Sequence, residues 1–121
     1  MSKRSDKLLL EDILEAIESV LEYTHDITVE EFFSNKKTKD AVIRNFEIIG
    51  EAANKLSIEL KNQYPHIDWQ GIIGFRNKLV HDYFGVDYDV VWNIKTNHLP
   101  KLKNDIRRLI SKSNTSSAFN S

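Results

Sequence analysis

Apolar residues recur at helical spacing along nearly the whole chain, and this pattern constrains the fold more than any other feature. Between about Ser5 and Thr24 they return every three or four residues, which places them on one face of a helix: Leu9, Ile13, Ala16, Ile17, Val20 and Leu21. Helix breakers are rare, with 4 Gly and 2 Pro in 121 residues. No segment shows a strand pattern. The sequence predicts an all-α protein, an up-and-down helical bundle of four main helices plus a short helix.

A short helix and a long one are predicted next. Thr28 and Glu31 form a capping-box pattern at the start of the short helix. The long helix is expected from about Lys37 to Asn62, before Tyr64-Pro65. Its inner stripe is Val42, Phe46, Ile49, Ala53, Leu56 and Leu60, and a second apolar strip is Ala41, Ile48 and Ala52. Two strips indicate two packing partners, so the second partner is either another helix of the same chain or another subunit.

Two further helices complete the predicted bundle. Asp68 is a suitable N-cap for a helix from about Trp69 to Tyr83 or Phe84, and Gly85 closes it. Asp87 begins the last helix, in which Pro100 predicts a kink or break near His98. Residues 113–121, SNTSSAFNS, are expected to form a disordered polar tail after a single helical domain at 1–112.

The composition excludes several classes of protein. The chain has no cysteine, so disulfides and thiol chemistry are excluded. Its four histidines lack the spacing of a metal site, no phosphate-binding loop is present, and we expect neither metal nor cofactor. Glu11 and Asp12 interrupt any signal-peptide core, and no apolar run reaches the roughly 20 residues of a membrane span. The default expectation is a soluble cytoplasmic protein.

The charge pattern leaves one local question open. A net charge of −1 argues against a protein that coats nucleic acid by bulk charge. Residues 95–112 nevertheless carry six cations against one Asp: Lys95, Lys101, Lys103, Arg107, Arg108 and Lys112. Such a run is either a solvated helix face or the electrostatic footprint of a polyanion.

Arg76 is the anomalous residue of the predicted helix at 69–84. On a helical wheel it lies in the middle of the apolar arc, about 60° from Leu79. An arginine among apolar neighbours is costly unless it is paired or reaches a polar cavity. Three interpretations follow: an ion pair with Glu47 or Glu51, a side chain that snorkels at a subunit boundary, or a cleft in which Arg76 binds an anion.

Arg76 is followed within eight residues by Asn77, His81 and Tyr83. Together they supply a fixed cation, a neutral hydrogen-bonding group, a group that titrates near neutrality and a phenol. These groups suffice to cleave RNA without a metal: the 2′-OH attacks phosphorus, histidine moves a proton and arginine stabilises the phosphoryl charge. Lys78 is a candidate RNA contact.

The helical geometry makes a single-chain site difficult. Arg76 and His81 lie about 140° apart on an ideal helix, so they do not converge on one point. Acid–base cleavage also needs two proton-transfer roles, and the motif has one histidine. A two-fold dimer would bring two Arg76 and two His81 to one groove, so we predict a composite site in a homodimer.

The stretch RNKLVHDY at 76–83 fits the R-x4-H-x-Y signature of the HEPN superfamily, and the chain resembles the HepT-like toxin branch of that superfamily. The resemblance covers most of the chain. Its segments are DILEAIESVLEYT near the start, RNFEIIGEAANKLS at 44–57, WQGIIGFRNKLVHDYFGVDY at 69–88, then VVWNI and LPKLKNDI.

This resemblance implies an all-α homodimer with metal-independent endoribonuclease activity, the toxin of a type VII-like toxin–antitoxin pair. By carry-over, Arg76 and His81 are catalytic and Asn77 supports them. The implied partner, besides the RNA substrate, is a minimal nucleotidyltransferase antitoxin that attaches AMP to Tyr83. The alternative is a non-catalytic module of the same superfamily that binds a nucleotide or docks a nucleotidyltransferase.

Overall fold

The protein is all-α, as predicted. The computed structural model describes residues 4–81 and 85–120, with side chains up to Lys112. Over these ranges it contains seven helices and no strand: α1 (Asp6–Tyr23), α2 (Val29–Ser34), α3 (Lys36–Lys55), α4 (Ile58–Gln63), α5 (Trp69–His81), α6 (Tyr88–Asn97) and α7 (Leu99–Asn120). No helix of the described chain is long and apolar enough to cross a membrane.

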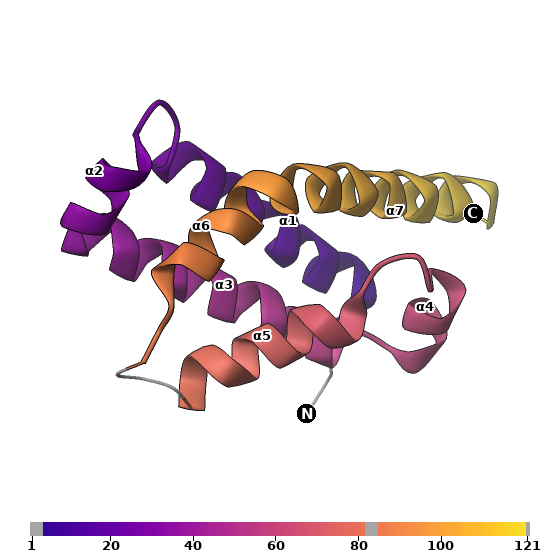
Figure 1. Ribbon diagram of the computed structural model, residues 1–121. Helices are drawn as coiled ribbons and strands as arrows, with labels where there is room; N and C mark the ends of the chain where they lie inside the picture. The colour runs from indigo at the N-terminus through magenta and orange to yellow at the C-terminus, as the bar shows by residue number, and fades with distance from the viewer. Residues whose placement is uncertain (1–3, 82–84, 121) are drawn as a thin grey trace.

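The helix α3 lies at the centre of the bundle (Figure 1). It packs against α1 on one side and α5 on another, while α7 packs against α1. Its inner stripe, including Val42, Phe46 and Ile49, is buried, and Ala52 of the second strip is buried too. Both strips of this helix therefore find packing partners within the chain, as one of the two interpretations requires.

The predicted long helix at 37–62 is wrong in one respect, because it is broken into α3 and α4 at Leu56 and Ser57. The Ser57 hydroxyl oxygen accepts a hydrogen bond from the Leu60 amide (3.1 Å) and donates one to the Asp6 carboxylate (2.6 Å). The Ser57 amide donates to the same carboxylate (2.9 Å). Ser57 thus begins a new helix instead of continuing the old one. The Lys61 ammonium donates to the carbonyls of Ala53 (3.2 Å) and Asn54 (3.4 Å) in the last turn of α3.

The predicted interruption near His98 is confirmed, and it is a kink between α6 and α7. Helical hydrogen bonds continue through it, from the His98 amide to Ile94 (2.9 Å) and from the Leu102 amide to the His98 carbonyl (3.1 Å). Pro100 has no N–H to donate, so one bond of the ladder is missing at this point.

The helix α7 includes residues 113–120, where a disordered tail is expected from the polar composition. The stretch contains neither glycine nor proline, so nothing in it ends the helix. The division into a helical domain at 1–112 and a disordered tail at 113–121 stays a prediction.

Replacing Ser57 by Ala should lower the free energy of unfolding by about 1–2 kcal/mol, because the N-cap of α4 and the link to Asp6 are lost together. Urea denaturation followed by circular dichroism measures this. Thr96→Ala, at an exposed position of α6, is the matched control and should change stability by less than about 0.5 kcal/mol. Equal stability of the two variants would contradict the role given to Ser57.

Candidate functional site

The helix α5 carries the R-x4-H residues and is fixed at both ends of its inner face. The Asp68 carboxylate accepts a hydrogen bond from the Gly71 amide (3.0 Å) at the predicted cap, and the Trp69 indole donates to the Tyr64 carbonyl (3.0 Å). Further along, the Phe75 ring meets Phe46 of α3 edge-on, with ring centroids 5.4 Å apart. Leu79 is buried. These contacts fix which face of α5 points at α3.

Arg76 is half-buried on this inner face, as the helical wheel predicts. Its Nη1 donates to Oδ1 of Asn77 (2.9 Å). Its Nε is buried and has no hydrogen-bond partner among the described residues. A buried N–H without a partner costs roughly 1–3 kcal/mol. Arg76 therefore costs the fold free energy that an apolar side chain at this position would avoid.

The ion pair of Arg76 with Glu47 or Glu51, one of the three interpretations, is not formed among the described residues. Glu47 instead lies 3.9 Å from Arg44 and Glu51 lies 3.4 Å from Lys55, each on α3 itself. Of the three interpretations of Arg76, the structure thus removes the buried ion pair.

The other motif residues lie toward solvent. Asn77 and Lys78 are exposed, and His81 is exposed at the last residue of α5. No hydrogen bond or ion pair links Arg76 to His81 among the described contacts, in keeping with their wide separation on the helix. Tyr83 lies outside the described residues. Asn77 lies one helical turn before His81 and also contacts Arg76, whereas no described contact joins Arg76 to His81.

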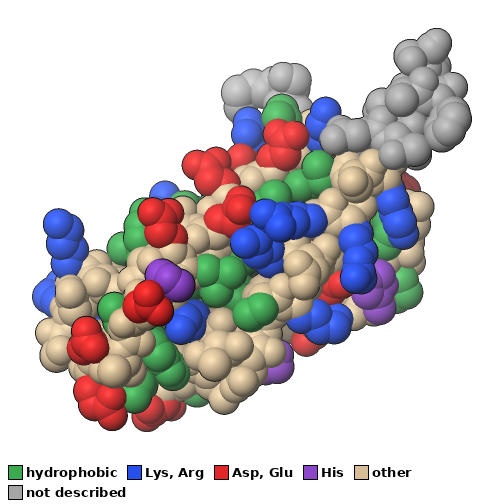
Figure 2. All heavy atoms as spheres, turned by 90° about the horizontal axis from the view of Figure 1, so that it is seen from above, with side chains coloured by type: hydrophobic (Ala, Val, Ile, Leu, Met, Phe, Trp, Pro, Cys, Tyr) green, Lys and Arg blue, Asp and Glu red, His purple; other side chains and the backbone are tan. Residues whose placement is uncertain are grey.

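Four cations of the basic segment at 95–112 share two carboxylates of the chain. Asp105 is paired with Lys101 (3.1 Å) and Arg108 (3.8 Å). Glu18 of α1 is paired with Arg107 (3.4 Å) and lies 4.0 Å from Lys103. Figure 2 shows acidic side chains beside basic ones over the middle of this face, and further Lys and Arg side chains toward its right with few acidic ones between them.

The two remaining cations of this segment lie over aromatic rings. The Lys95 ammonium is 4.0 Å from the Trp92 ring centroid, and burial there lowers its pKa. The Lys112 ammonium lies 5.5 Å from the ring centroid of Tyr64. Such contacts favour a cation that stays close to the protein.

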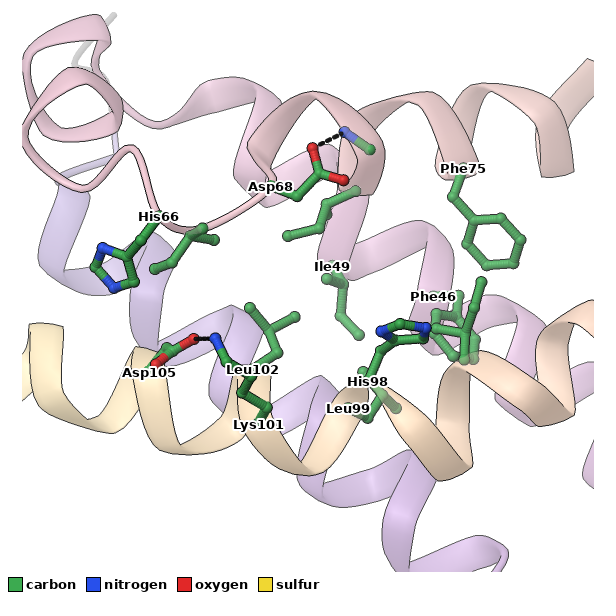
Figure 3. A pocket seen from close by; sticks show the side chains of 14 residues that line it. Phe46, Ile49, His66, Asp68, Phe75, His98, Leu99, Lys101, Leu102 and Asp105 are labelled. Carbon is green, nitrogen blue, oxygen red and sulfur yellow. Dashed lines mark hydrogen bonds and ion pairs between the residues drawn. The ribbon is translucent and has the colours of Figure 1, made fainter.

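The sequence did not reveal a cavity of about 370 Å³ between α3, α5 and the α6–α7 junction (Figure 3). Its walls are mostly apolar, with Phe46, Ile49 and Phe75 among them, and His66 and His98 also line it. Neither Arg76 nor His81 lines it. Its residues come from distant parts of the chain and share no local motif, so the cavity could not be predicted from the sequence. No described group of His, Asp and Glu has the arrangement of a metal site.

The fold and the site together define a helical bundle with a candidate anion-binding site: Arg76 on α5 is half-buried and has no carboxylate partner in the described part of the chain, and His81 follows five residues later. The ribonuclease HepT-like family model matches residues 13–109. This chain therefore belongs to the HepT-like ribonuclease family.

Three relatives illustrate the similarity. The chain is 46% identical over 107 residues to "Probable ribonuclease HepT" of Thermococcus cleftensis, covering 88% of this chain and 97% of the relative. It is 43% identical over 106 residues to "Putative RNase MJ1380" of Methanocaldococcus jannaschii (88% and 97% covered) and 41% identical over 109 residues to "Putative RNase MJ0127" of the same organism (90% and 88% covered). No solved structure matches the chain significantly.

Arg76→Met should leave the free energy of unfolding within about 1 kcal/mol of the wild type, or raise it, because the substitution removes a buried unpaired N–H and keeps an unbranched apolar stem. Urea denaturation is the measurement, with Lys78→Met on the exposed face of α5 as the control for helix propensity. A loss of about 3–5 kcal/mol, as when a buried ion pair is broken, would restore the structural interpretation of Arg76.

Proposed function

We propose that this protein is a metal-independent endoribonuclease that cleaves RNA at a composite site shared by two copies of the chain, and that it is the toxin of a toxin–antitoxin pair. The observation that carries the proposal is Arg76, a half-buried guanidinium with no carboxylate partner among the described residues. The names of the relatives, which describe ribonucleases, support the class of reaction. Arginine suits this role because its planar fork matches phosphate oxygens and stays charged.

The proposed reaction is an internal transesterification. The 2′-OH loses a proton to one His81 while its oxygen attacks the adjacent phosphorus. The bond from phosphorus to the 5′ oxygen breaks, and that oxygen takes a proton from the second His81. Arg76 stabilises the charge on the non-bridging oxygens, and Asn77 holds the guanidinium through its hydrogen bond. The products are a 2′,3′-cyclic phosphate and a 5′-OH, and no step needs a metal or a cofactor. Lys78 is proposed to contact the RNA backbone.

The composite site follows from the separation of Arg76 and His81 along α5. The two residues lie about 7.5 Å apart along the helix axis and about 140° apart around it. Two copies of α5 related by a two-fold axis would place the Arg76 of one copy near the His81 of the other. A monomer with full activity would contradict this part of the proposal.

The protein should cleave RNA in the presence of excess chelator and leave the same strand with 2′-deoxyribose uncut. His81→Ala and Arg76→Ala should each lower the cleavage rate by about 10²–10⁴-fold, the range for removing an acid–base group or an electrostatic stabiliser. Gel analysis with detection of the cyclic phosphate end measures this, and circular dichroism checks the fold. Absence of cleavage by folded protein with unmodified Tyr83, across varied RNAs, would favour the non-catalytic binding module.

We propose further that a nucleotidyltransferase antitoxin silences the protein by attaching AMP to Tyr83. The added phosphate would place negative charge and bulk beside the RNA-binding groove and repel the substrate. Tyr83→Phe should keep the ribonuclease activity and resist silencing by the antitoxin. Co-expression growth assays and mass spectrometry of the modified protein measure these two properties. Equal silencing of Tyr83→Phe and wild type would show that the modification is not the mechanism.

A further inference from the structure

Gly50 of α3 lies directly beneath Arg76 of α5. A Cβ atom added at Gly50 would overlap the Cβ of Arg76, and it would lie 2.7 Å from the Cγ of the same side chain. It would also lie 3.2 Å from the carbonyl oxygen of Ile72. Carbon atoms at van der Waals contact are about 3.5–4.0 Å apart, so only glycine leaves room for the arginine stem at this crossing.

This close approach determines which atoms of Arg76 reach solvent. The stem lies against the backbone of α3, and Nε is buried without a described partner. Nη1 is held at the other end by Asn77 (2.9 Å). The terminal Nη groups therefore carry the N–H donors that remain accessible, and an anion would meet the guanidinium from its end rather than along its Nε edge.

We propose that Gly50 is a positioning residue for Arg76: the missing side chain seats the arginine stem so that the terminal nitrogens face the substrate phosphate. The proposal rests on the proposed ribonuclease function for its catalytic consequence, but the seating itself is a property of the free protein. Gly50 acts through Arg76 and touches no substrate.

Gly74 of α5 provides a matched control. An added Cβ there meets nothing within 4 Å, so Gly74→Ala makes the same chemical change without any overlap. Both substitutions replace a glycine inside a helix by alanine, and alanine has the higher helix propensity. A difference between the two variants therefore reports the contact with Arg76.

The first measurement is solvent exchange of the Arg76 Nε–H by NMR, with the signal assigned by its loss in Arg76→Lys. In the wild type and in Gly74→Ala this proton should be protected relative to that of the exposed Arg44. In Gly50→Ala the protection should be lost, because the stem is displaced from α3. This readout needs no RNA and no activity. Retained protection in folded Gly50→Ala would overturn the proposal.

The second measurement separates positioning from loss of fold. Gly50→Ala should lower the cleavage rate about a hundredfold, as expected for a misplacement near 1 Å, while Gly74→Ala stays within about twofold of the wild type. RNA binding is measured in the His81→Ala variant, in which cleavage is suppressed, and the logarithm of the binding constant is plotted against the logarithm of the salt concentration. Adding Gly50→Ala should make this slope shallower by about 0.7, the value for the loss of one phosphate contact. A merely destabilised but folded protein would keep the slope.

If Gly50→Ala does not fold, the double variant Gly50→Ala/Arg76→Gly tests whether the overlap with Arg76 is the reason. Removing the Arg76 side chain relieves the overlap, so the double variant should recover the fold. Failure of the double variant to fold as well would overturn the proposal and assign Gly50 to general helix packing. If the wild type neither binds nor cleaves RNA, the proposed function fails, and the exchange measurement alone decides the seating of Arg76.

Discussion

The contact between α3 and α5 is the interaction on which the candidate site depends. Two features bring the helices together: the ring of Phe46 packs edge-on against Phe75, and Gly50 leaves space for Arg76. The helix α3 also packs against α1, so it links α5 to the main core. A shift of α5 along α3 would move Arg76 away from Gly50, and its stem would lose the space that the glycine leaves.

Arg76 lowers the stability of the fold relative to an apolar side chain at the same position. Its Nε lies in a buried position without a described partner, and the nearby carboxylates of Glu47 and Glu51 are paired with other cations of α3. An apolar side chain of similar length would fill the same space without the desolvation cost of roughly 1–3 kcal/mol. The packing around α5 therefore gives no reason for an arginine here, whereas an anion bound at the terminal Nη nitrogens would give one.

Periodicity and capping residues were enough to predict the helices from the sequence. The prediction was wrong where contacts with residues distant in the sequence determine the structure. Thr28, Asp68 and Pro100 act locally, so their effects on helix ends could be predicted. The break at Ser57 depends on the carboxylate of Asp6, 51 residues away, and local helix propensity does not register it. The cavity beside α5 is likewise invisible in sequence because its walls come from distant segments. For the candidate site, the inward position of Arg76 was predictable from the wheel, but its freedom from Glu47 and Glu51 was not, since several rotamers would allow pairing.

The exposed position of His81 has a physical consequence for any proton transfer at this site. A general acid or base acts most strongly where water is excluded and its partners are fixed, and His81 in a single chain meets neither condition. The neighbouring Val80 is 44% exposed, an apolar side chain also open to solvent. A second surface that covered this end of α5 would bury Val80 and exclude water from His81 in the same step. The exposure of His81 and Val80 is therefore consistent with the proposed composite site, in which one chain supplies the arginine and another supplies the histidine beside it.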